Sequence, residues 1–324
     1  MRLTRYKRAK VVPLRRGDVV ALRSPAEILA TLDDTGSLDG LPFMPEMLGH
    51  FGRPHVVSAR VERACDTITQ SGARQMPDTV ILDDLRCDGG GHAGCQAACR
   101  IFWKEAWLRR VDPDAEVAQS TDSVEALREL AVANSHRTGG AERDAEVFRC
   151  QATDFLKATK PLEFWDLRSF GRELSSRNVS VWRFLRVIAH IIGNEPFRRL
   201  GRTRMPFKQV GGGVEIRSSN GLQPGSIVRV RQADEIAATL DANSRLRGLW
   251  FDREMLPYCG ARATIKSKVS RFIDEESGAM VELASDCYIL DGVVCEGYVS
   301  EGRWFCCRAI YPWWREAWLE PESK

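Results

Sequence analysis

The sequence lacks several features that would assign a function class at once. No uncharged apolar run approaches the roughly 20 residues of a membrane span, and the basic N-terminus has no apolar stretch typical of a signal peptide. The net charge is only +3, too small to demand a polyanionic partner. Glycine-rich nucleotide-binding motifs are also missing. These absences disfavour membrane proteins, exported proteins and nucleotide-cofactor enzymes, and they predict a cytoplasmic location.

The composition is otherwise that of an ordinary globular protein, with one oddity. The chain has 324 residues, of which 44% are hydrophobic and 28% charged; at about 150 residues per domain this length predicts two domains. The oddity is a total of ten cysteines. In a reducing compartment, clustered cysteines indicate metal ligands or reactive thiols before they indicate disulfides.

A long internal repeat organises the chain. The stretch that begins at Gly17 returns at Gly225, and Cys87 returns as Cys295, each pair separated by 208 positions. After a net insertion of three residues, Trp-Lys-Glu-Ala-Trp at 103–107 matches Trp-Arg-Glu-Ala-Trp at 314–318. Each copy covers roughly 95 residues, a length that suits one small domain.

Each copy has the pattern of a small β-rich domain. Apolar or alternating runs predict strands at 18–23, 55–63 and 79–82, and a serine cap with a following proline predicts a short helix at 24–33. Such a mixture predicts an α+β, strand-rich fold with a small, partly open barrel. The Gly-Asp-Val-Val-Ala-Leu-Arg opening at 17–23 resembles the first strand of SH3-like barrels.

The layout predicted from this repeat is barrel, helical insert, barrel. Between the copies, apolar residues at helical spacing predict helices at 123–133, 164–174 and 179–192. The predicted boundaries are a basic N-terminal segment at 1–13, a first β-barrel at 14–110, a helical insert and linker at 111–221, and a second β-barrel at 222–320.

The sharpest local signal is Cys-Asp-Gly-Gly-Gly-His-Ala-Gly-Cys-Gln-Ala-Ala-Cys at 87–99. Its glycine-rich turn can fold tightly around an ion, and its four candidate ligands are Cys87, His92, Cys95 and Cys99. Three cysteines and one histidine suit zinc, whereas thiolates with an unusual fourth ligand suit an iron–sulfur cluster. The spacing leaves the metal open. In the competing interpretation Cys99 is a packing residue and His92 a solvated loop residue.

The second copy retains only part of this pattern. It keeps counterparts of Cys87 and Cys95 but has no histidine in its loop, and Ile310 stands where Cys99 would be. One hypothesis is a second site built from the cysteines of this copy, namely Cys287, Cys295, Cys306 and Cys307. Another is a pseudo-twofold arrangement in which both copies contribute to one shared four-thiolate site, formed by Cys87, Cys95, Cys295 and Cys306.

The remaining candidates favour structural roles. Cys65, Cys150 and Cys259 are isolated in sequence and are interpreted mainly as packing residues, although Cys150 is also a candidate fourth cluster ligand or nucleophile. Glu46 recurs as Glu254 and favours a turn-stabilising role over that of a general base. The repeated tryptophan motif favours the core of a terminal helix over an aromatic binding platform.

Two classes of function follow, with a third less favoured. In the first, the metal is structural and the tandem barrels form a binding or scaffolding module for a protein or small-molecule partner. In the second, the first copy carries the single centre of a zinc or iron–sulfur metalloenzyme. The third, nucleic-acid binding, rests on the basic N-terminus and on arginines at 198–204.

Overall fold

The computed structural model describes residues 12–117, 122–137, 146–163, 166–199, 221–298, 300 and 303–322. Most of the basic segment at 1–13 and most of the arginine run at 198–204 therefore lie outside the described residues. The fold is mixed α+β and rich in strands, as the sequence predicts. No helix in the described ranges combines the length and the apolarity that are needed to cross a membrane.

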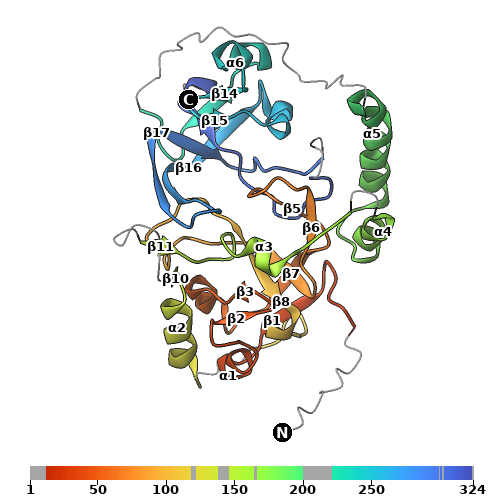
Figure 1. The fold of residues 1–324 in the computed structure, drawn as a ribbon, viewed down its shortest axis with the longest axis vertical. Coiled ribbons are helices and arrows are strands. Elements are labelled where there is room, and N and C mark those ends of the chain that lie inside the picture. The colour runs from red at the N-terminus through yellow and green to blue at the C-terminus, as the bar shows by residue number, and fades with distance from the viewer. Residues whose placement is uncertain are drawn as a thin grey trace.

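A curled, five-stranded antiparallel sheet forms the first lobe (Figure 1). Its strand order is β8-β7-β4-β1-β9, with bounds Arg100–Lys104, Thr79–Arg86, His55–Arg60, Val19–Leu22 and Leu108–Arg110. The predicted alternation is present, because Val57, Ala59 and Val61 are all buried. Shorter elements complete the lobe: α1 (Pro25–Leu29), β2 (Ser37–Leu38), β3 (Leu41–Pro42), η1 (Pro45–His50), β5 (Ala64–Cys65), β6 (Ala73–Gln75) and η2 (Glu105–Trp107).

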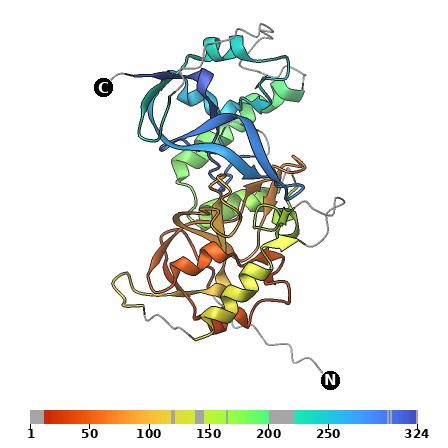
Figure 2. The same cartoon turned by 90° about the vertical axis from the view of Figure 1, so that its left-hand side faces the viewer.

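A second five-stranded sheet has the same strand order and forms the second lobe. Its order is β18-β17-β16-β13-β19, with bounds Trp314–Arg315, Met280–Leu290, Arg262–Ile273, Ile227–Val230 and Leu319–Pro321. Shorter elements are α6 (Ala233–Thr239), β14 (Arg245–Leu246), β15 (Leu249–Trp250), η3 (Arg253–Tyr258) and η4 (Glu316–Trp318). Strands β16 and β17 are longer than their counterparts β4 and β7, and together they form a hairpin that extends towards the first lobe (Figure 2).

The repeated tryptophan motif lies in the core of each lobe. All four of its tryptophans are fully buried, which agrees with a structural role. The motif is not helical, however: Trp103 lies in β8 and Trp107 in the 3-10 turn η2. The indole of Trp107 donates to Thr31 Oγ1 at 3.0 Å, and in the second lobe Trp318 donates to Thr239 Oγ1 at the same distance. A strand end followed by a tight turn thus brings both rings inward, which their spacing of four residues alone would have placed on a helix.

The segment between the lobes contacts both of them. It contains α2 (Val124–Ala133), β10 (His136–Arg137), β11 (Val147–Phe148), α3 (Phe155–Ala158), β12 (Lys160–Pro161), α4 (Leu167–Ser175) and α5 (Val181–Arg199), so all three predicted helices are present. Gln151 donates to Phe102 O in the first lobe at 2.9 Å. Phe170 of α4 packs against Phe305 of the second lobe, with ring centroids 5.8 Å apart.

The two lobes interlock by a reciprocal backbone contact. The Gln96 amide of the first lobe donates to Arg271 O of β16 at 3.1 Å. The Cys307 amide of the second lobe donates to Arg63 O, beside β5, at the same distance. Gln96 and Cys307 are counterparts in the repeat, and so are Arg63 and Arg271. Each lobe therefore pairs a strand end with the cysteine loop of the other.

Arg308 anchors this interlock from the second lobe. Its guanidinium is almost fully buried, donates to Cys65 O at 3.0 Å and to Thr67 Oγ1 at 2.7 Å, and pairs with Glu275 at 2.7 Å. Because a buried cation needs this complete set of acceptors, the contact fixes the two lobes in one arrangement.

Replacement of Arg308 by alanine should weaken the interlock. We expect Arg308→Ala to lower the free energy of unfolding by about 3 kcal/mol, because it removes one partner of a buried ion pair. Arg262→Ala is the control, since Arg262 is an exposed arginine that pairs with Glu322, and its loss should cost less than about 1 kcal/mol. Chemical denaturation measures both values. Equal, small losses would show that the Arg308 contact does not hold the lobes together.

Candidate metal centre

The predicted chelating loop connects β7 to β8 and is tightly folded. The amides of His92 and Gly94 both donate to Gly89 O at 2.9 Å. Gly89 has φ +74°, and a Cβ at this position would overlap the backbone of Cys95. A glycine is therefore required where the chain turns back on itself.

Within this loop, Cys87 and His92 lie beside Glu46 of η1. The Glu46 Oε1 atom accepts from His92 Nδ1 at 2.6 Å, from the Gly91 amide at 3.0 Å and from Cys87 Sγ at 3.5 Å. One ligand atom from each of the three side chains lies within 4.8 Å of the other two. Glu46, Cys87 and His92 thus form a group that is able to hold a metal ion.

The group is buried and electrostatically coupled. Burial alone would lower the pKa of His92, but the hydrogen bond and the charge of Glu46 outweigh burial and raise it. Burial alone would raise the pKa of Glu46, but His92 lowers it. Burial, and then the charge of Glu46, raise the pKa of the Cys87 thiol well above its usual range. Without a metal, the arrangement is therefore an imidazolium–carboxylate pair next to a neutral thiol.

One atom of this group points to a missing partner. Glu46 Oε2 is buried and has no hydrogen-bond partner among the described residues. A buried carboxylate oxygen without a donor costs free energy unless a cation or donor binds there. The donor set fits zinc, which binds carboxylate, thiolate and imidazole ligands.

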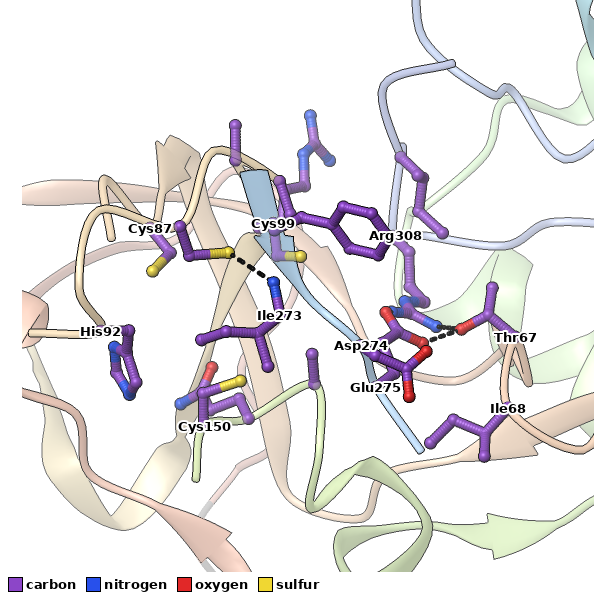
Figure 3. Close-up of a pocket in the computed structure, with 18 of the residues that line it drawn as sticks. Thr67, Ile68, Cys87, His92, Cys99, Cys150, Ile273, Asp274, Glu275 and Arg308 are labelled. Carbon is purple, nitrogen blue, oxygen red and sulfur yellow. Dashed lines mark hydrogen bonds and ion pairs between the residues drawn. The ribbon is translucent and has the colours of Figure 1, made fainter. Parts of the chain in front are cut away.

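The other two predicted ligands, Cys95 and Cys99, line a cavity next to this group. The cavity has a volume of about 320 Å³, and Cys87, His92 and Cys150 also line it (Figure 3). Cys95 Sγ accepts from the Ile273 amide of the second lobe at 3.4 Å. Burial raises the pKa of Cys99 to about 12 and that of Cys150 to about 11. Four thiols from separate positions of the chain therefore face one internal space.

The cysteines considered for a second or shared site have different surroundings. Cys287 is fully buried in β17 and packs with Val269, Ile289 and Tyr311. Cys306 Sγ accepts from the Cys65 amide at 3.2 Å, whereas Cys307 packs against the core of the first lobe. The Cys295 amide donates to Ile310 O at 2.8 Å, as the Cys87 amide does to Cys99 O.

Two members of the site were not expected as its main ligands. Glu46 precedes Cys87 by 41 positions, and its repeated Phe-x-x-Glu-Met-Leu setting indicated only a turn. Cys150 stands alone in the insert and was interpreted mainly as a packing residue. The signal that could have singled out Glu46 is its recurrence as Glu254 at the same offset as the cysteines.

Comparisons with known proteins do not assign the chain to a family. No protein-family model matches it, and no curated protein or solved structure shows significant similarity to it. The function is therefore argued from the site itself.

The loop geometry gives a prediction with a matched control. We expect Gly89→Ala to disrupt the loop and reduce metal binding, because the added Cβ overlaps the backbone of Cys95. Gly94→Ala is the control, because Gly94 has the same φ of +74° but open space around its Cβ position. Metal content and the denaturation midpoint should fall further in Gly89→Ala. Equal effects would show that backbone strain alone, and not the close approach, matters.

The His92–Glu46 pair predicts how the stability of the metal-free protein depends on pH. Because the pKa of His92 is raised on folding, its contribution is fully present below about pH 6.5, the ordinary pKa of histidine. The contribution is lost as the pH rises through the raised value. Urea denaturation across this range should show the loss in the wild type, and the His92→Gln variant should lack it. An identical pH dependence in both proteins would contradict the pairing.

Proposed function

We propose that the chain is a metal-binding protein in which one zinc ion is held by Glu46, Cys87 and His92. The observation that carries the proposal is the convergence of these three ligand atoms around the buried Glu46 Oε2, which lacks a partner in the described part of the chain. Zinc is favoured over calcium or magnesium because those ions take oxygen ligands alone.

The burial of the ligands supports a structural role for the metal. The side chains of His92 and Glu46 are 1% and 3% exposed, so bulk water has little access to them. Bound zinc would stabilise the Cys87 thiolate and tie the 87–99 loop to η1, and it would act as a Lewis acid if a ligand reached it. In this proposal the chain is a binding or scaffolding module for a protein or small-molecule partner.

A metalloenzyme with its single centre in the first lobe is the main alternative, and the cavity supports it. Cys87 and His92 line this cavity together with Cys95, Cys99 and Cys150. The four thiols make this space suitable for an iron–sulfur cluster, which is commonly held by four cysteine thiolates. In that case Glu46 and His92 would brace the loop and would not bind the metal.

The wider assignments belong to the same proposal. We assign the two lobes to duplicated, SH3-like half-barrels at 14–110 and 222–320, joined by the insert at 111–221, in a cytoplasmic protein. The support is the sequence repeat and the shared strand order of the sheets. The nucleic-acid alternative rests on basic segments that lie largely outside the described residues and is not developed.

Two variants distinguish zinc from a cluster. Protein purified without oxygen and without chelators should contain one zinc per chain and be colourless. We expect Glu46→Gln to weaken zinc binding more than tenfold, because even the loss of a residue that only orients a ligand has about this effect. Cys150→Ser should retain the zinc, since Cys150 is not one of the three ligands. Elemental analysis and zinc competition with a chromogenic chelator measure both.

The matched control is Glu254→Gln, which changes the counterpart of Glu46 in the second lobe. Glu254 accepts from the Ser300 amide at 2.7 Å and from the Tyr298 amide at 3.3 Å, so its role is to hold a loop. This variant should keep its zinc. Iron with stoichiometric sulfide and visible absorbance, both lost in Cys150→Ser, would replace the zinc proposal with the cluster. Unchanged zinc binding in Glu46→Gln would contradict the proposed ligand set.

A further inference from the structure

The cysteine loop of the second lobe has the same backbone fold as the 87–99 loop. The Cys306 amide donates to Arg303 O at 2.8 Å, as the Cys95 amide does to His92 O at 3.1 Å. Gly297 has φ +60°, and a Cβ there would overlap Arg303 O and the Cys306 amide. The second loop is therefore built to hold Cys295 and Cys306 in the arrangement of Cys87 and Cys95.

The interlock adds a third thiol to this loop. In the first lobe, Cys95 Sγ accepts from the amide of Ile273. In the second lobe, Cys306 Sγ accepts from the amide of Cys65 at 3.2 Å. Cys65 and Ile273 are counterparts, separated by the same 208 positions. The reciprocal contact thus presents an apolar side chain to the first loop and a thiol to the second.

The three thiols are buried and in contact or close to one another. Cys65, Cys295 and Cys306 are only 3%, 9% and 9% exposed. The Cys65 and Cys306 thiols are hydrogen-bonded to each other, and the charge of Cys65 also acts on Cys295. The three sulfurs are not as close together as the ligand atoms of the Glu46 group, so a bound ion would draw the Cys295 sulfur inward.

The charged surroundings suit thiolates and exclude harder ligands. The guanidinium groups of Arg303 and Arg308 both favour the ionised form of Cys65, and Arg308 also binds the Cys65 carbonyl at 3.0 Å. The nearest carboxylate of the loop, Glu254, is engaged by backbone amides. Arg303 stands where the first loop has His92, so this site has no imidazole. Its only strong metal ligands are therefore sulfur atoms.

We propose that Cys65, Cys295 and Cys306 form a second, all-thiolate metal site that both lobes complete, and that it takes a soft ion of the Cu(I) class. Soft thiolate ligands select such ions. Binding exchanges the thiol protons for the metal, with no change in oxidation state: three S–H bonds break, three S–metal bonds form and the protons are released to solvent. The site is separate from Glu46, Cys87 and His92 and does not depend on the metal bound there.

Cu(I) titration of the reduced, metal-free chain tests the site. The experiment starts from a Cys87→Ser background, which disables the first site, and counts the Cu(I) that the chain retains against a chromogenic Cu(I) chelator under anaerobic conditions. Adding Cys65→Ile, which installs the residue found at the corresponding position of the other lobe, should remove one equivalent of Cu(I). Adding Cys259→Ser should remove none, because Cys259 lies outside both groups of thiols.

A second variant protects the test against misfolding. Cys295→Ser changes the site from within the second lobe, away from the contact between lobes, and should remove the same equivalent while the circular dichroism spectrum stays unchanged. Equal Cu(I) retention in the Cys65→Ile, Cys295→Ser and Cys259→Ser proteins would overturn the proposal. A Cys65–Cys306 disulfide in anaerobically purified wild type would also overturn it. Neither result bears on the first site, which is tested by zinc binding to Glu46→Gln.

Discussion

The arrangement of the chain depends on one reciprocal contact, in which a strand end of each lobe pairs with the cysteine loop of the other. An irregular loop has backbone and sulfur acceptors that it cannot satisfy internally, and burial makes each unsatisfied group costly. Here the Ile273 and Cys65 amides supply donors to Cys95 and Cys306 across the interface. Neither loop is complete without the opposite lobe, so any metal bound in these loops also senses how the two lobes are joined.

The same loop fold supports different chemistry in the two lobes. The first loop places His92 against Glu46, whereas the second places Arg303 against Asp252. Both are pairs of a cation and a carboxylate, so each braces the loop electrostatically. Only imidazole can also release its proton and bind a metal at neutral pH, because arginine stays protonated. This one difference in residue type separates a site with mixed ligands from a site with sulfur ligands alone.

Local features were largely predictable from sequence, and long-range pairings were not. The alternation around Val57, the cap before α1 and the glycine-rich 87–99 loop all have local patterns that match the structure. The spacing of Trp103 and Trp107 indicated a helix, but a strand end and a 3-10 turn place both rings in the core. The contacts of Glu46 with His92 and of Cys65 with Cys306 span 46 and 241 positions. No local periodicity encodes such pairs, although the repeat offset aligns Cys65 with Ile273.

The central claim is that the two cysteine loops form two metal sites of different composition. Cadmium NMR on protein loaded with the spin-active isotope tests it most directly, because the chemical shift of cadmium reports how many sulfur ligands surround each ion. The account predicts two resonances, one in the range of all-thiolate sites and one displaced by oxygen and nitrogen ligands. A single resonance, or two with the same sulfur-only shift, would contradict it.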